Sequence, residues 1–395
     1  MQTSIGRRLP IDALRTMSEM LPLQVVELTP PGRGAVATLL VEGPGAAALV
    51  ERKFRACGGR PLRSGAADRL VFGRFGDPPG EELVVHCRSG RSVELHCHGG
   101  TAAVAMVEKV LVEFGCRVVP WRDWLGARQE DPIAAAAGAA LAEARTEPTA
   151  AILLDQYHGA LRREFEQIEQ ALRNHDATGA RRRVDALLAR AELGRHLVRP
   201  WQVVLAGRTN VGKSSLINAL LGYGRAIVHP TPGTTCDVVT ATTAMGGWPV
   251  ELSDTAGLRA AEDAVERAGV QRARQQLADA DLLVLVFDAS KTWSDSDKAL
   301  LDAWPNALPI DNKCDLLGEA APTPGQTAAR HIPASCRVCS GANRLTTSAL
   351  TGQGIEALVR AIAGRLVPDP PPPGAAVPFT DEQVQALIGY RASIR

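Results

Sequence analysis

Aromatic residues and long apolar runs are both scarce in this chain of 395 residues. Phe, Trp and Tyr together make up only 4%, which argues against stacked aromatic platforms as its main means of binding nucleic acids. No stretch approaches the roughly 20 apolar residues that a membrane-spanning helix needs, and the first thirty residues contain no signal-peptide core. We therefore expect a cytoplasmic protein that makes no use of the membrane.

Net charge is nearly absent as well, at +1, so any contact with RNA would have to be local. The run Arg181-Arg182-Arg183 could make such a contact, but a charged run on a helix is more often a solvated face. The apolar fraction of 45% and the charged fraction of 22% are typical of a globular protein. Its length suits about two or three domains.

A disulfide framework is also missing, because the eight cysteines, at positions 57, 87, 97, 116, 236, 314, 336 and 339, show no repeated spacing. Such cysteines suit a reducing compartment. Cys336 and Cys339, with His331 nearby, form a lone C-x-x-C pair. Without a second pair this is weak support for zinc, and we favour an ordinary loop.

Histidine and cysteine also alternate in His96-Cys97-His98, a short distance after His86-Cys87. On a strand, His96 and His98 would face one way and Cys97 the other. A single site cannot easily gather all of them, so we expect core and turn roles.

The segment 207–214, Gly-Arg-Thr-Asn-Val-Gly-Lys-Ser, satisfies the phosphate-loop pattern G-x-x-x-x-G-K-[ST]. It lies between a predicted buried strand at 201–206 and a predicted helix that ends near Gly222. Gly207 and Gly212 would let backbone N–H groups surround the phosphates, aided by the helix N-terminus. Lys213 would neutralise the β and γ oxygens, and the Ser214 hydroxyl would ligate Mg²⁺.

Three further motifs follow in order. Gly233-Thr234-Thr235 places Thr235 to bind Mg²⁺ when GTP orders its loop. Asp254-Thr255-Ala256-Gly257 follows the predicted strand 250–253, so Asp254 would hold Mg²⁺ through water and the Gly257 amide would sense the γ-phosphate.

The base-reading motif Asn312-Lys313-Cys314-Asp315 follows a strand at 309–310. Its Asp315 carboxylate can accept hydrogen bonds from guanine N1 and the 2-amino group, which adenine cannot offer together. Ser348 and Ala349 would support the base edge. The sequence therefore predicts a GTPase whose GTP-binding residues are Asn210, Val211, Gly212, Lys213, Ser214, Ser215, Thr234, Thr235, Asp254, Gly257, Asn312, Lys313, Asp315, Ser348 and Ala349.

One position departs from simple GTPases. Leu258 stands where a glutamine usually orients the attacking water, so another group must do so.

The predicted fold class is α/β: a Ras-like P-loop GTPase domain, a small N-terminal α/β domain and an abbreviated helical domain. We place the N-terminal domain at 1–120, the helical domain at 121–198, the GTPase domain at 199–367, and a Pro-rich linker with a terminal helix at 368–395. In the helical domain the runs 150–173 and 180–197 have few helix breakers. Alternating strands and helices in 199–367 predict a mostly parallel sheet.

The motifs together resemble those of the MnmE (TrmE) family of tRNA modification GTPases. The resemblance lies in Pro30-Pro31-Gly32-Arg33-Gly34, Glu94-Leu95-His96-Cys97-His98-Gly99-Gly100, Asn210 in the phosphate loop, Ala226-Ile227-Val228 before Gly233-Thr234-Thr235-Cys236-Asp237, and Asp254-Thr255-Ala256-Gly257-Leu258-Arg259 before Val265-Glu266-Arg267-Ala268-Gly269.

The resemblance implies GTP hydrolysis with Mg²⁺ and K⁺ in a homodimer. Asn210 and backbone groups of loop 229–234 would ligate K⁺. Glu266 would position the attacking water through a second water, making Glu266, Lys213 and Thr235 the catalytic residues. Without the resemblance, Glu266 is better explained as an exposed helix carboxylate.

The resemblance also implies an MnmG-like flavin-dependent partner, tRNA as substrate, and a tetrahydrofolate derivative contacted by Glu94. Leu40, however, stands where the family has an arginine, and the Phe-Leu-Asn-x-Lys stretch is absent around 124–131. The family's final Cys-x-Gly-Lys is absent too, since this sequence finishes Ala392-Ser393-Ile394-Arg395.

Two hypotheses therefore stay open. The first is a divergent GTPase that modifies carbon 5 of the wobble uridine in tRNA. The second is a paralogous switch that keeps the GTP cycle, has lost the folate chemistry and regulates another partner, such as ribosome assembly.

Overall fold

The computed structural model describes residues 22–29, 34–59, 62, 69–223, 241–254, 280–320 and 344–394. The chain divides into two compact units, Met1–Pro132 and Ile133–Arg395. In the described ranges no helix is long and apolar enough to cross a membrane.

The first unit is built on a seven-stranded sheet with the strand order β3-β4-β5-β6-β2-β1-β7. All neighbouring strands are antiparallel except β1 and β7, which are parallel. The strands are β1 (Gln24–Glu27), β2 (Val36–Glu42), β3 (Phe54–Ala56), β4 (Arg69–Phe75), β5 (Glu81–Ser89), β6 (Ser92–His98) and β7 (Arg117–Val118).

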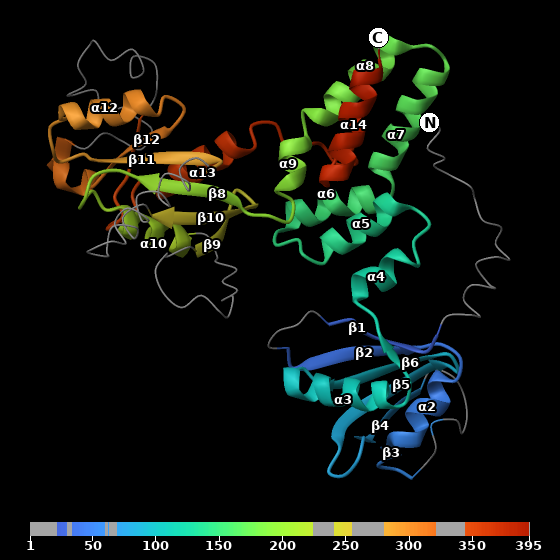
Figure 1. Cartoon of the computed structure of the whole chain (residues 1–395). Coiled ribbons are helices and arrows are strands. Elements are labelled where there is room, and N and C mark those ends of the chain that lie inside the picture. Colours follow the sequence, from blue (N-terminus) through green and yellow to red (C-terminus); the bar gives the residue numbers. More distant parts are fainter. Residues whose placement is uncertain are drawn as a thin grey trace, which may run out of the picture. The chain divides into compact units, whose positions relative to one another are not determined.

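Helices α2 (Ala46–Lys53) and α3 (Thr101–Glu113) share one core with this sheet (Figure 1). Side chains on β6 alternate between the two faces, and Val93, Leu95 and Cys97 enter the core with α2 and α3. Glu94 and His96 therefore lie on the opposite face. A short helix, α4 (Trp121–Gly126), ends this unit, and its Trp124 indole donates to Glu42 at 3.0 Å.

The second unit begins with helices that form a layer of their own (Figure 1): α5 (Pro132–Leu141), α6 (Glu147–Tyr157), α7 (Ala160–Arg173), α8 (Ala177–Leu188) and α9 (Ala191–Arg195). The predicted helical run 150–173 is interrupted, because Gly159 adopts a φ of 87° between α6 and α7. The terminal helix α14 (Asp381–Ser393) packs on α8, and an ion pair of 3.0 Å joins Arg391 to Asp185.

The rest of the second unit is a six-stranded sheet in the order β13-β12-β11-β8-β10-β9. All its pairs are parallel except β9 with β10, which confirms the mostly parallel sheet. The strands are β8 (Trp201–Ala206), β9 (Ala241–Met245), β10 (Trp248–Asp254), β11 (Leu282–Asp288), β12 (Leu308–Asn312) and β13 (Leu345–Thr346).

Helices cover both faces of this sheet. Core residues of α10 (Lys213–Tyr223) and α13 (Ile355–Leu366) pack with Val203 and Leu205 of β8. α12 (Asp295–Ala303) packs on the other face with Val204 and Ala206. A 3₁₀ segment, η2 (Cys314–Ala320), follows β12. This arrangement confirms the predicted α/β fold class with a P-loop GTPase domain, and it directs the carboxyl ends of β8, β10, β11 and β12 to one edge.

Candidate GTP-binding site

The loop after β8 adopts backbone angles that only glycine accommodates at two points. Gly207 has a φ of 154° and Gly212 a φ of 94°. A Cβ atom on Gly207 would lie 2.3 Å from the Val286 carbonyl oxygen, and one on Gly212 would lie 2.5 Å from Nδ2 of Asn312. Both glycines thus allow the tight turn that a phosphate-binding loop needs.

Lys213 lies against the inside of this loop. Its side chain is buried, and Nζ donates to the carbonyl oxygens of Gly207 at 3.2 Å and Arg208 at 3.0 Å. The ammonium group is therefore held where the loop would wrap around phosphates, as the sequence predicts for a group that neutralises them.

Ser214 and Asp254 meet at the edge of the sheet. The Ser214 hydroxyl donates to Oδ2 of Asp254 at 2.7 Å. Asp254 ends β10, which runs parallel to β8 and pairs Asp254 with Leu205. Two oxygen groups predicted to serve Mg²⁺ are thus adjacent, which suits a hard cation.

Asn312 connects the phosphate loop to the base-reading segment. It is only 1% exposed; its Nδ2 donates to the Val211 carbonyl at 2.9 Å, and its Oδ1 accepts from the Ala349 N–H at 3.2 Å. Ser348 is fully buried, and its hydroxyl accepts from the Thr351 N–H at 3.1 Å, so it fixes its own turn. The Asn312 side chain therefore contacts both the phosphate loop, at Val211, and the turn at 348–349.

Lys313 makes a second connection. Its Nζ donates to the Asn210 carbonyl at 2.5 Å and to Oδ2 of Asp288 at 2.9 Å. Burial alone would raise the pKa of Asp288, but hydrogen bonds from Ser290 and Lys313 outweigh it and lower that pKa. Asp288 was absent from the predicted site, although its position at the carboxyl end of a parallel strand could have indicated it.

The remaining predicted residues divide into two groups. Asp315 is partly exposed at the start of η2, and Ser215 is exposed in the first turn of α10. The loop 229–234, Thr234, Thr235, Gly257 and Glu266 lie outside the described residues, as do His331, Cys336 and Cys339. Their roles stay predictions.

Glu94, the predicted folate contact, lies on β6 and faces Leu40 of β2 and His86 of β5. Its Oε1 is 2.7 Å from the Arg88 guanidinium, and its Oε2 is 3.2 Å from Nδ1 of His86. His96 lies on the same side as Glu94, whereas Cys97 is buried on the other. The expected separation of Cys97 is therefore correct, but the pairing of β5 with β6 brings His86 and His96 together beside Glu94, a grouping that was not expected from the sequence.

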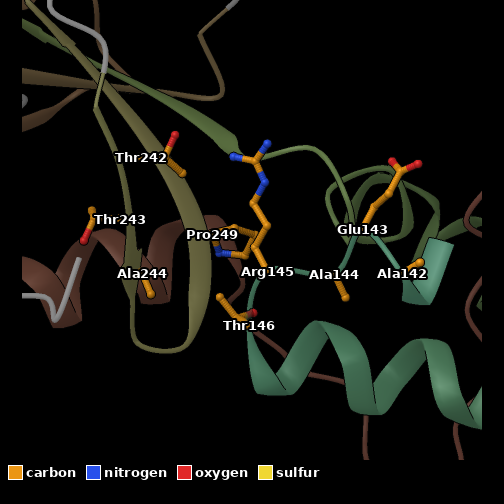
Figure 2. Close-up of a pocket in the computed structure, with 9 residues that line it drawn as sticks. All are labelled: Ala142, Glu143, Ala144, Arg145, Thr146, Thr242, Thr243, Ala244 and Pro249. Carbon is orange, nitrogen blue, oxygen red and sulfur yellow. The ribbon is translucent and has the colours of Figure 1, made fainter. Parts of the chain in front are cut away.

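A cavity of about 300 Å³ lies elsewhere in the second unit (Figure 2). One wall is the segment Ala142 to Thr146 between α5 and α6, and the other is formed by Pro249 of β10 with Thr242, Thr243 and Ala244 of β9. In Figure 2 the Arg145 side chain extends between these walls. None of the lining residues belongs to a GTP motif, so the cavity is separate from the nucleotide site.

Known GTPases match the part of the chain that holds this site. Residues 202–313 match a family model described as a 50S ribosome-binding GTPase. The G domain of the T. maritima FeoB iron transporter is 26% identical, with 42% of this chain and 99% of that chain covered, at a TM-score of 0.30.

Two relatives extend the similarity well beyond the GTPase domain. The tRNA modification GTPase MnmE of Prochlorococcus marinus is 35% identical over 402 residues, which cover 88% of this chain and 82% of that protein. The MnmE of Thermus thermophilus is 32% identical over 398 residues, with 92% and 86% covered. This chain therefore belongs to the MnmE family of tRNA modification GTPases.

Proposed function

We propose that this protein binds and hydrolyses GTP at the site around segment 207–214 and uses the GTP cycle in modifying carbon 5 of the wobble uridine in tRNA. One observation carries the GTPase part: Asn312, Lys313 and Ser214 tie the phosphate loop to the ends of the neighbouring strands. The tRNA part rests on membership of the MnmE family.

In the proposed mechanism, Lys213 neutralises the β and γ oxygens of GTP. The Ser214 hydroxyl would ligate Mg²⁺, and Asp254 would hold Mg²⁺ through a water molecule. Thr235 joins them when its loop orders, and the Gly257 amide donates to the γ-phosphate. Mg²⁺ supplies charge neutralisation at the transferring phosphoryl group. By resemblance to the family, Glu266 positions the attacking water through a second water, a role that the apolar side chain of Leu258 cannot take.

Asn210 is the proposed K⁺ ligand. It adopts a φ of 63°, and Lys313 already donates to its backbone carbonyl. The side-chain amide oxygen is then the group that Asn210 offers to a hard cation. We propose that a second copy of the chain completes the site by ordering loop 229–234, and that an MnmG-like flavin-dependent protein is the partner.

The described residues do not fit a tetrahydrofolate derivative at Glu94. A pterin ring would need the carboxylate to accept from its own N–H groups. Here Arg88 and His86 contact the two oxygens, and the facing residue is Leu40. We therefore derive no step through folate and propose that Glu94 does not bind the carbon donor.

The test is nucleoside analysis of tRNA from a bacterial strain that lacks its own MnmE and expresses this chain. Restored 5-substituted uridine at the wobble position is the expected result, and Lys213→Ala should restore none. Unmodified uridine, with the protein folded and bound to GTP, would contradict the tRNA part and favour the regulatory switch.

A further inference from the structure

We propose that His86, Glu94 and His96 form a binding site for one divalent transition-metal ion in the first unit. Candidate ligand atoms of the three side chains all lie within 4.8 Å of one another. The inference does not depend on the proposed GTPase or tRNA function.

The sheet itself brings the three residues together. β5 and β6 are antiparallel, and their register places His86 directly opposite Glu94. His96 follows Glu94 by two residues on β6, so both side chains leave the sheet on the same face. That face is opposite to the one that packs on α2 and α3. The site therefore needs no loop to form.

The two ligand distances measured from Glu94 are close to those of a metal site. Bonds of about 2.1 Å in a tetrahedral zinc site place the ligand atoms roughly 3.4 Å apart. Oε2 of Glu94 is 3.2 Å from Nδ1 of His86 and 3.7 Å from Nε2 of His96. A hydrogen bond explains the first distance but not the second, which is too long. One ion among the three atoms would fit both distances.

Neighbouring side chains orient these ligands. Thr38 Oγ1 lies 3.0 Å from Nδ1 of His96, which directs the other ring nitrogen toward Glu94. Arg88 contacts Oε1 of Glu94 at 2.7 Å, so Oε2 faces the histidines. Such second contacts are usual at metal-binding histidines and carboxylates. Glu94 is only 8% exposed, so its carboxylate position is already restricted.

The ligand set indicates the class of metal. Two imidazoles and one carboxylate suit Zn²⁺ or Fe²⁺, whereas Mg²⁺ and Ca²⁺ prefer oxygen ligands alone. Three protein ligands leave at least one position for water or another small ligand. The site therefore has the composition of an open, rather than a closed structural, metal centre.

The experiment uses the full-length chain carrying Cys336→Ser and Cys339→Ser, which removes the C-x-x-C pair. The protein is stripped of metal, held in excess Mg²⁺ and titrated with Co²⁺ and Zn²⁺. We expect one equivalent of either ion per chain, and a visible Co²⁺ absorption without a thiolate charge-transfer band. His86→Asn and His96→Asn should each weaken binding by more than about tenfold.

His98→Asn is the matched control. His98 lies on the same strand but pairs with Glu81 at 2.5 Å, so metal binding should be unchanged. Thr38→Val alters no ligand and should weaken binding by about tenfold or more, which tests the orientation of His96 without removing it. Absence of a bound equivalent in the parent protein, a thiolate band, or equal binding by parent and His96→Asn would overturn the proposal.

Discussion

At the residue scale, guanine recognition depends on one carboxylate. Asp315→Asn should weaken GTP binding by roughly 10- to 100-fold, because charge-assisted hydrogen bonds to the base are lost. The same variant should bind xanthosine triphosphate better than the parent protein does, since xanthine carries a carbonyl to which the new amide can donate. Nucleotide titration with fluorescent analogues measures both.

Asp302→Asn, exposed on α12, serves as the control and should change neither affinity. Undiminished GTP affinity in Asp315→Asn would show that another residue reads the base.

The two glycines at 212 and 222 offer a second comparison. Gly212→Ala should lower GTP affinity by at least about 100-fold, because its φ of 94° and the Asn312 amide 2.5 Å from the new Cβ both oppose the change. Gly222 lies in α10 with no atom within 4 Å of a new Cβ. Gly222→Ala should keep GTP binding and gain about 0.5–1 kcal/mol of unfolding free energy. Equal GTP affinity in the two variants would contradict the described loop.

Residues whose role depends on local spacing could be predicted from the sequence. Lys213, Ser214 and Asn312 belong to short motifs, so their neighbours along the chain indicate their chemistry. His86 could not be assigned in this way. Its partners lie on another strand, and the register that brings them together is a property of the sheet.

At the scale of elements, a buried ion pair joins Arg344, directly before β13, to Asp311 of β12. The Arg344 guanidinium contacts Asp311 at 2.5 Å and stacks over Trp293, with 4.1 Å from its Cζ to the ring centroid. Burial raises the pKa of Asp311, although Arg344 acts in the opposite direction. Because the folded-state pKa exceeds the unfolded-state value, this carboxyl's contribution to stability falls as pH rises through the folded pKa.

Arg344→Met removes the charge that favours ionised Asp311. The unfolding free energy should therefore fall by about 3–5 kcal/mol near pH 8 and by less near pH 5, where more of the Asp311 is protonated. Urea unfolding at the two pH values measures this. Arg360→Met, which breaks an exposed pair with Glu356, should cost less than about 1 kcal/mol at either pH. A loss for Arg344→Met that does not depend on pH would contradict the assigned coupling.

Gln156 of α6 holds the segment that leads to α14. Its side chain donates to the Ala375 carbonyl at 3.0 Å and accepts from the buried Val377 N–H at 3.2 Å. Gln156→Leu should leave that N–H unsatisfied, at a cost of about 1–3 kcal/mol, and speed proteolytic cleavage within 368–380. Limited proteolysis with mass spectrometry measures the rate. Gln170→Leu, exposed on α7, should cleave at the parent rate.

Several elements were expected close to their observed bounds, including β8, β10 and the end of α10, because each lies beside a recognised GTPase motif. No separate element was expected for β4, α5 or β9. β4 alternates Arg with apolar residues and carries Gly73, and α5 is almost entirely alanine, so neither has a clear period. β9 is an edge strand with little apolar content, and pairing with β10 defines it.

At the scale of the whole molecule, the proposed dimer makes turnover depend on protein concentration and on the monovalent ion. GTP hydrolysis per chain should rise with protein concentration in KCl and stay low in NaCl, because K⁺ and a second copy together order the catalytic loop. Asn210→Ala should reduce the difference between the two salts. Steady-state phosphate release measures it, and equal rates in KCl and NaCl would remove K⁺ from the mechanism.

The division into domains could be predicted only in outline from composition. Residues from the helices and from the six-stranded sheet join one continuous core, including Leu153, Leu197 and Val203. His196 also stacks on Trp201, with ring centroids 3.6 Å apart. A core that two segments share cannot be recognised from the local sequence of either segment. The separate boundaries at 198 and 367 therefore stay predictions.

The buried amide of Asn312 has a consequence for the kinetics of nucleotide exchange. Because this single side chain touches both the phosphate loop and the turn at 348–349, neither can open alone without losing a hydrogen bond inside the protein. Release of the base and release of the phosphates are then coupled through that amide, since opening either side costs a hydrogen bond of about 0.5–1.5 kcal/mol. GDP would leave in a single exponential step, and a factor that accelerates exchange could act from either end of the nucleotide.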